Sequence, residues 1–251
     1  MDIPPFYEFL IGFSDKERTR YAFLTSEKRL IPVEIEMTFP SYNRVSKRIY
    51  GVRNKNGEDV IGEIKLFSEQ NDFKPLFSLS QQRIFHTTVS EDGQKIAFLT
   101  QDKTGQDILL RVVAKEEFGW FPLPFIRMKA SLSGLCFCSA DVLMYADEKE
   151  NLCAVRLKKP VKTVPLALNG RYPAFDQKTQ KTAFIQNKNL IVFNEISYKL
   201  KSENHISPAF SKSAGTLFFT DWNGLYSYDP ETKEVRTVFT APSEIVFFAE
   251  L

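Results

Sequence analysis

Short apolar runs rich in β-branched and aromatic residues recur along the chain, each bounded by polar, turn-forming segments. Such residues fit the pleated, half-buried surface of a strand better than a helix. Six of the runs share the form of a central strand: Tyr21–Thr25, Ile49–Arg53, Ile96–Thr100, Leu143–Asp147, Thr182–Gln186 and Leu217–Asp221. Successive runs begin on average about 39 residues apart, which is in the range of one four-stranded propeller blade. The pattern predicts an all-β fold built from repeats.

The segments that flank the runs repeat as well. Seven positions before each of the last five runs stands a residue suited to a buried strand, namely Tyr42, Val89, Cys136, Phe175 or Phe210. Turn-rich clusters such as Glu91–Gln94 lie in between, and a second turn such as Asn54–Gly57 leads to a third strand. Glycine, aspartate and asparagine favour hairpin turns because they tolerate positive φ. With a more polar fourth strand, each unit is predicted to be a four-stranded antiparallel meander.

One such sheet cannot bury both faces alone, so about six units in 251 residues predict a closed six-bladed β-propeller. We expect a single domain over residues 1–251. The first unit has no room for a fourth strand before Pro40, whereas the last has a spare apolar strand at Ile245–Leu251. We expect this C-terminal strand to supply the missing outer strand of the first blade and to hide two sheet edges. A five-bladed ring with an irregular N-terminal extension is the alternative.

The segment Thr88–Thr100, followed by Gly105–Leu110, resembles the repeat of the TolB-like (WD-like) β-propeller superfamily, which runs apolar-Ser-x-Asp-Gly-x-x-Ile-Ala-Phe. Similar patterns occur at Tyr172–Phe175 and at Ser207–Ser211, although Gln177–Gln180 lacks the Asp-Gly pair. The resemblance covers nearly the whole chain and concerns the blades only. It implies a propeller fold, and propellers of this superfamily serve as protein-binding platforms, as gating domains of serine peptidases, or as lactonases and lyases.

Charge and composition narrow the classes of partner. The 33 basic and 31 acidic residues give a net charge of +2, so we expect no general binding to nucleic acid. No stretch of 18 apolar residues occurs, which predicts no membrane span. Three cysteines cannot all pair within one chain, and this favours a reducing, cytoplasmic location. A periplasmic or secreted location is the alternative if a signal segment has been removed.

Signatures of catalysis are missing from the sequence. It contains no Gly-x-Ser-x-Gly nucleophile motif and no glycine-rich phosphate loop. The two histidines, His86 and His205, are too few for a three-histidine metal site. Cys136 and Cys138 form a Cys-x-Cys that we interpret as a buried or inert pair. We therefore predict no catalytic residue, no metal site and no cofactor.

The candidate arginines and histidines lie in the segments that lead into the first strand of each blade. Trp120 lies in a long connection, Glu117–Pro124, and Trp222 in the hairpin turn between the second and third strands of the last blade. Guanidinium groups suit carboxylate or phosphate groups, and exposed Trp and Arg dominate protein-binding hot spots. The predicted partner-binding residues are Arg44, Arg83, Arg127, Arg171, His86, His205, Trp120 and Trp222. If the propeller is built as predicted, they lie at one mouth of its channel.

Two functional hypotheses follow. The first is a non-enzymatic propeller platform that binds a protein or peptide, in particular an acidic one, through loops at one channel mouth. The alternative is a small-molecule-binding protein or a metal-assisted enzyme of the lactonase or lyase kind. Its site would lie in the central channel and would use His86, His205 and a carboxylate.

Overall fold

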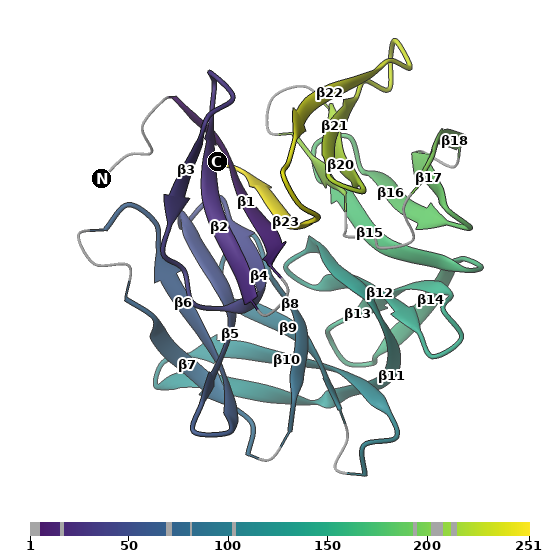
Figure 1. Cartoon of the computed structure of the whole chain (residues 1–251). Coiled ribbons are helices and arrows are strands. Elements are labelled where there is room, and N and C mark those ends of the chain that lie inside the picture. Colours follow the sequence, from purple (N-terminus) through teal and green to yellow (C-terminus); the bar gives the residue numbers. More distant parts are fainter. Residues whose placement is uncertain are drawn as a thin grey trace. The chain divides into compact units, whose positions relative to one another are not determined.

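A computed structural model describes residues 6–15, 18–68, 72–80, 82–101, 104–192, 195–201, 208–211 and 215–251. In these residues the chain forms antiparallel β-strands and no helix, which agrees with the all-β prediction (Figure 1). The chain divides into two compact units. The middle unit is Glu36–Arg171, and the terminal unit combines the residues up to Ile35 with those from Tyr172 onward. The prediction of one domain over residues 1–251 stays a prediction.

The middle unit contains two sheets. The smaller has the order β4-β5-β6-β7, with β4 (Thr38–Asn43), β5 (Arg48–Lys55), β6 (Glu58–Lys65) and β7 (Lys74–Ser78). The larger has seven strands in consecutive order from β8 to β14. These are β8 (Ile84–Val89), β9 (Lys95–Gln101), β10 (Ile108–Glu116), β11 (Gly119–Ser139), β12 (Val142–Asp147), β13 (Leu152–Arg156) and β14 (Lys162–Ala167).

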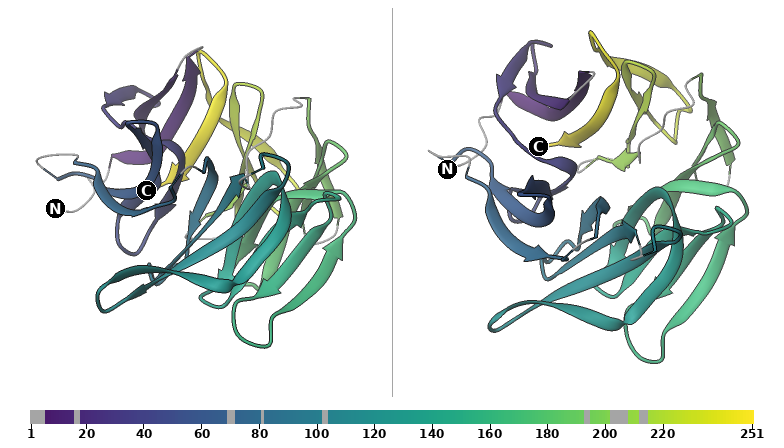
Figure 2. Two further views of the ribbon diagram at one scale, coloured as in Figure 1. Left: turned by 90° about the horizontal axis from the view of Figure 1, so that it is seen from below. Right: turned by 60° about the horizontal axis from the view of Figure 1, so that its bottom comes forward.

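The seven-stranded sheet forms because β11 is 21 residues long and pairs with two different strands. Its first part, up to Lys129, pairs with β10, and its second part, from Ala130, pairs with β12. The pairing with β10 breaks between Pro122 and Arg127, where four residues of β11 face one residue of β10. Proline cannot donate to a ladder, so the break falls beside the two prolines of this segment. In both views of Figure 2 the teal β10–β11 hairpin projects beyond the strands beside it.

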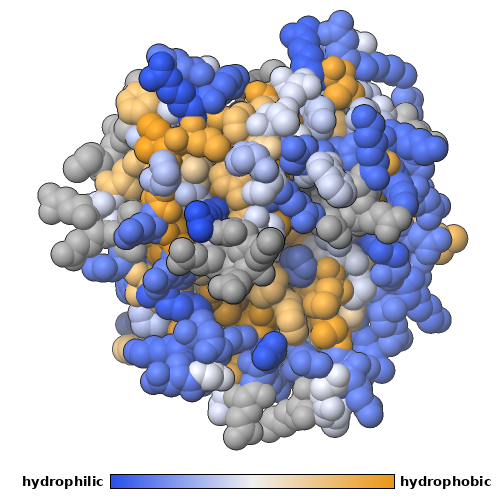
Figure 3. Space-filling model, in the orientation of Figure 1, coloured by the Kyte–Doolittle hydropathy of each residue, from blue (hydrophilic) through white to orange (hydrophobic). Residues whose placement is uncertain are grey.

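The terminal unit contains three four-stranded sheets. The first has the order β23-β1-β2-β3, with β1 (Tyr7–Asp15), β2 (Arg18–Thr25), β3 (Leu30–Val33) and β23 (Ile245–Glu250). The second contains β15 (Gly170–Asp176), β16 (Lys181–Gln186), β17 (Asn189–Val192) and β18 (Glu195–Lys199). The third contains β19 (Ala209–Phe210), β20 (Leu217–Asp221), β21 (Gly224–Tyr228) and β22 (Val235–Thr240). The outer strand β22 has no fully buried residue, and Figure 3 shows hydrophilic residues gathered over β21 and β22.

Five sheets are thus seen in the described residues, four of four strands and one of seven. This division does not confirm the count of six blades, which stays a prediction.

The core is divided among several clusters because the central strands are buried on both faces. In β9, Ala97 and Leu99 belong to one cluster, which also contains Leu110 and Val155. Ile96 and Phe98, on the opposite face of the same strand, belong to another cluster with Tyr50 and Val113. Successive side chains of a strand point to opposite faces, so a continuous apolar run marks a strand covered from both sides.

The hairpin between β8 and β9 shows the predicted turn chemistry. The Ser90 hydroxyl accepts a hydrogen bond from Lys95 N at 2.8 Å, and the Asp92 carboxylate accepts one from Gln94 N at 3.0 Å. Gly93 completes the turn at φ +67°, a conformation that glycine adopts without steric cost. The hairpin that follows β15 lacks this Asp-Gly pair, and there the Asp176 carboxylate accepts hydrogen bonds from Lys178 N and from the Thr179 hydroxyl.

The C-terminal strand β23 completes the first sheet, as predicted, but on a different edge. It pairs with β1 through Leu10↔Ala249 and Ile11↔Phe248, so it takes the place of a first strand instead of the outer place beside β3. The physical reason is that Phe9, Leu10 and Ile11 are all buried. Consecutive buried residues make β1 a central strand, which needs a neighbour on each side.

The packing of β23 generates a stability prediction. Phe248 is 6% exposed and lies in a cluster with Phe9 and Ile11. Replacing Phe248 by Ala should lower the free energy of unfolding by about 3 to 5 kcal/mol, measured by denaturant unfolding. The same substitution at Phe118, which is 88% exposed, is the control and should change it by less than about 0.5 kcal/mol. Equal effects at both positions would show that the tail strand is not part of the core.

Candidate functional site

The first strands of several sheets share a left-handed residue. Phe39 in β4, His86 in β8 and Tyr172 in β15 have φ of 49°, 45° and 52°, and each stands three positions before the repeated residue Tyr42, Val89 or Phe175. The pairing register shifts at the first two of them. Gly134, at φ 82°, marks a similar shift in β11. A β-bulge re-aims a side chain, and positive φ in bulky residues is costly and clusters at functional sites.

In the middle unit the bulges bring together a cluster that we call the bulge patch: Phe39, Phe85, His86 and Leu132. The Phe39 ring lies 5.6 Å from the His86 ring and 5.9 Å from the Phe85 ring, measured between centroids. The His86 side chain bonds to the backbone of Leu132. Phe39 is 37% exposed and Leu132 42% exposed. The patch therefore presents apolar surface to solvent beside a partly buried imidazole.

Burial lowers the pKa of His86 below its ordinary value, and the hydrogen bond to the Leu132 backbone opposes this effect only in part. The imidazole is therefore neutral at pH 7. A neutral ring among aromatic and aliphatic neighbours suits an apolar or aromatic group of a ligand better than an anion.

Arg83 and Arg44 lie at opposite ends of neighbouring strands, which corrects the expected grouping. The Asn43 amide, at the end of β4, donates to the carbonyls of Ser90 (2.9 Å) and Glu91 (3.0 Å) just beyond the end of β8. The two strands therefore run in the same direction. Arg44 follows β4, whereas the exposed Arg83 directly precedes β8. A shared mouth for Arg44 and Arg83 is thus wrong, and their part in partner binding stays a prediction.

The other two predicted arginines have neighbours that the sequence did not reveal. Arg171, in β15, forms an ion pair with Glu150, from the turn between β12 and β13. This carboxylate already neutralises the guanidinium that was expected to bind an acidic partner. Arg127 lies within β11 and not in a loop, directly opposite Arg111 of β10.

The two tryptophans differ in their surroundings. Trp120, in β11, is partly buried and packs against the cluster that contains Tyr50, Val113 and Phe98. Trp222 is 69% exposed and occupies the turn between β20 and β21. His205 lies outside the described residues.

Trp222 is held in an unfavourable backbone conformation. It has φ of 59° at the first position of a two-residue hairpin turn, where glycine is favoured. The corresponding turn between β5 and β6 uses Asn56 and Gly57, both at positive φ, which is the residue pair that this geometry favours. An exposed tryptophan in place of such a residue gains little burial to offset its backbone strain.

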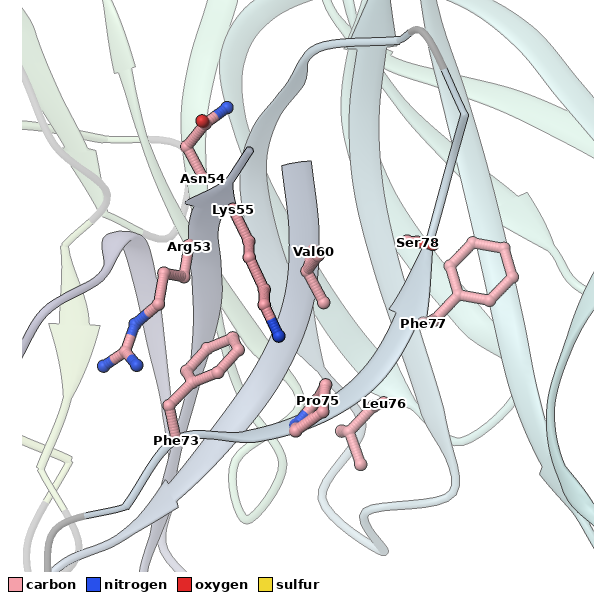
Figure 4. A pocket seen from close by; sticks show the side chains of 9 residues that line it. All are labelled: Arg53, Asn54, Lys55, Val60, Phe73, Pro75, Leu76, Phe77 and Ser78. Atoms are coloured by element: carbon pink, nitrogen blue, oxygen red, sulfur yellow. The ribbon is translucent and has the colours of Figure 1, made fainter. Parts of the chain in front are cut away.

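A pocket of about 580 Å³ lies on the β5–β6–β7 sheet, lined by Arg53, Asn54, Lys55, Val60, Phe73, Pro75, Leu76, Phe77 and Ser78 (Figure 4). Glycine at position 62 allows the Phe73 ring to approach the sheet, because a Cβ there would lie 2.3 Å from Phe73 Cζ. The Arg53 guanidinium stacks 4.5 Å from that ring and donates to the Glu36 carbonyl at 3.0 Å. The lining holds Arg53 and Lys55 and no carboxylate. The Glu36 carboxylate, outside the lining, lies 3.7 Å from the Arg53 guanidinium, so Lys55 is the cation that can accept an acidic group next to an apolar one.

Within the described residues no group of three or more His, Cys, Asp or Glu side chains could hold a metal ion. The described segments also contain no helix long and apolar enough to cross a membrane. Of the cysteines, burial raises the pKa of the Cys138 thiol to about 12 and raises that of Cys153 as well. Neither thiol is poised as a thiolate at pH 7.

The environment of His86 generates a pH prediction. The unfolded chain, with a histidine pKa near 6.5, binds the proton more readily than the folded chain. Stability present above that pH is therefore lost as the pH falls toward the lowered pKa. In His86→Gln, the free energy of unfolding should fall less between pH 7.5 and pH 5 than in the wild type, measured by denaturant unfolding at both pH values. An equal fall in the two proteins would mean that His86 does not titrate as inferred.

Solved structures share this fold at low sequence identity. No protein-family model and no curated protein matches the sequence. Among solved structures, TolB from Acinetobacter baumannii matches over 97% of this chain with a TM-score of 0.73 and 11% identity, and the chain spans 66% of the TolB chain. A nidogen/laminin complex matches over 96% of this chain and 97% of the other, with a TM-score of 0.68 and 12% identity. An acylaminoacyl peptidase matches over 94% of this chain and 46% of its own length, with a TM-score of 0.55 and 12% identity.

These likenesses show the fold. The chain has a TolB-like β-propeller fold, as the sequence repeat predicted.

Proposed function

We propose that this protein is a non-enzymatic β-propeller platform that binds a protein or peptide partner through exposed loops at one end of its sheets. The observation that carries the proposal is Trp222, 69% exposed and held at φ 59° in a hairpin turn. Glycine at this turn would relieve the backbone strain, and tryptophan is among the residues that contribute most to binding energy in interfaces.

The position of Trp222 supports a role at the loop end. In an antiparallel four-stranded meander, the turn between the second and third strands lies at the end where the first strand begins. Trp222 occupies that turn in its own sheet. Arg83 and the bulge patch lie near the corresponding end of β8 in the middle unit.

The two surfaces of the middle unit suggest the chemistry of the partner. The bulge patch offers apolar area around Phe39 and Leu132, and the pocket on β5–β7 offers the Lys55 ammonium beside Phe73. A peptide that carries a carboxylate next to an aromatic or aliphatic side chain fits both kinds of surface. Acidic peptides are therefore the proposed class of partner.

The structural neighbours support the proposal at the level of the fold. One similar chain belongs to a complex of nidogen with laminin, so this fold occurs in binding between proteins.

We extend the proposal to the architecture: six blades in a ring, of which two share β11, with β23 closing the first. The division of β11 between β10 and β12 supports this count, because it yields two four-stranded meanders.

The experiment is capture of partners on the immobilised full chain from cells that express it, quantified by mass spectrometry. Trp222→Gly should lose the captured protein while its free energy of unfolding stays unchanged or rises by up to about 1 kcal/mol. The control is Phe118→Ala, which removes an 88% exposed aromatic from another hairpin turn and should retain the partner. Retention of the partner by Trp222→Gly, or failure of the wild type to capture any protein, would contradict the proposal.

A further inference from the structure

Two arginines face each other across neighbouring strands of the middle unit. Arg111 of β10 and Arg127 of β11 are directly paired in register. Like charges directly opposite each other in a sheet are destabilising, so this pair lowers the stability of the hairpin unless something compensates for it.

Arg111 has a second unfavourable feature. Its Nε is buried and has no hydrogen-bond partner. Burial and, to a lesser degree, the charge of Arg127 lower the pKa of the Arg111 guanidinium. A buried donor without a protein partner is rare in native proteins, so the Arg111 Nε–H is available to an acceptor that the protein itself does not supply.

Lys129, two residues after Arg127 in β11, differs from the two arginines because it has carboxylate partners. Lys129 forms ion pairs with Asp107 at 3.1 Å and with Glu148 at 3.6 Å. Within the described part of the chain, neither Arg111 nor Arg127 has a carboxylate within 4 Å. The strand thus neutralises its lysine and leaves two adjacent guanidinium groups uncompensated.

We propose that Arg111 and Arg127 together form a binding site for a phosphate monoester group. A guanidinium presents a planar fork of N–H donors that matches phosphate oxygens. A phosphate monoester carries a charge of about −1.5 to −2 at pH 7, which balances two guanidinium groups where a single carboxylate would balance one. Arg127 is exposed and Arg111 is partly buried, so the site is open to solvent on one side and anchored on the other.

The inference goes beyond the proposed function, because it uses neither Trp222 nor the surfaces named there. The phosphate group has two possible sources: a small phosphorylated compound, or a phosphorylated side chain of a partner protein. Both sources present the same group to the two arginines, and the experiment distinguishes them.

The first test measures melting temperature in inorganic phosphate and in chloride at equal ionic strength. The proteins are the full-length wild type, Arg111→Gln, Arg127→Gln and the control Lys115→Gln, which removes an exposed charge from the same strand. Phosphate should raise the melting temperature of the wild type and of Lys115→Gln but not of the two arginine variants. In chloride, Arg127→Gln should be at least as stable as the wild type, because the repulsion is gone. Since Arg127 is exposed, this variant carries the test if Arg111→Gln does not fold.

The second test measures the affinity of a phosphoserine peptide by fluorescence anisotropy, with the matching serine peptide as control. Arg127→Gln should weaken binding of the phosphate group about tenfold or more, the size expected for loss of a charge-assisted hydrogen bond. Tighter binding of the phosphopeptide than of inorganic phosphate assigns the site to a partner protein, and equal binding assigns it to small phosphorylated compounds. The proposal is overturned if phosphate stabilises all four proteins equally or does not stabilise the wild type.

Discussion

The need to cover both faces of each central strand is the constraint on which the rest of the structure depends. The runs in β5, β9, β12 and β20 are apolar on both sides, so a single sheet would leave one of its apolar faces in water. In strand β9 both faces are buried, because the side chains of each face pack into a different hydrophobic cluster. The position of β23 beside β1 has the same origin. Within each unit, the sheets therefore stabilise one another where their apolar faces are buried.

Much of this architecture could be predicted because its signals are local. The apolar runs, the Ser90–Gly93 turn and the superfamily resemblance all depend on residues close together in the sequence. The edge that β23 occupies and the sharing of β11 could not be predicted in this way. They depend on which partner each strand finds, and partners such as Ile11 and Phe248 are far apart along the chain.

The candidate site was harder to predict, because the fate of each charged side chain depends on a distant neighbour. The sequence does not reveal that Glu150 neutralises Arg171, that Arg111 faces Arg127, or that Trp120 packs into a cluster. The left-handed residues of the first strands were missed for another reason. Phe39 and Tyr172 are not residues that favour positive φ. Each of Phe39, His86 and Tyr172 lies three positions before a repeated residue, Tyr42, Val89 or Phe175. This common spacing is visible in the sequence, but it indicates a bulge only once the backbone conformation is known.

The pairing of β1 with β23 also joins two strands that are far apart in the order of synthesis. Strand β1 ends at Asp15, and β23 begins only at Ile245. Until β23 has been made, the first sheet exposes an unpaired edge of the apolar strand β1, which can associate with other chains. We expect fast elongation or chaperone binding to protect that edge until β23 has left the ribosome.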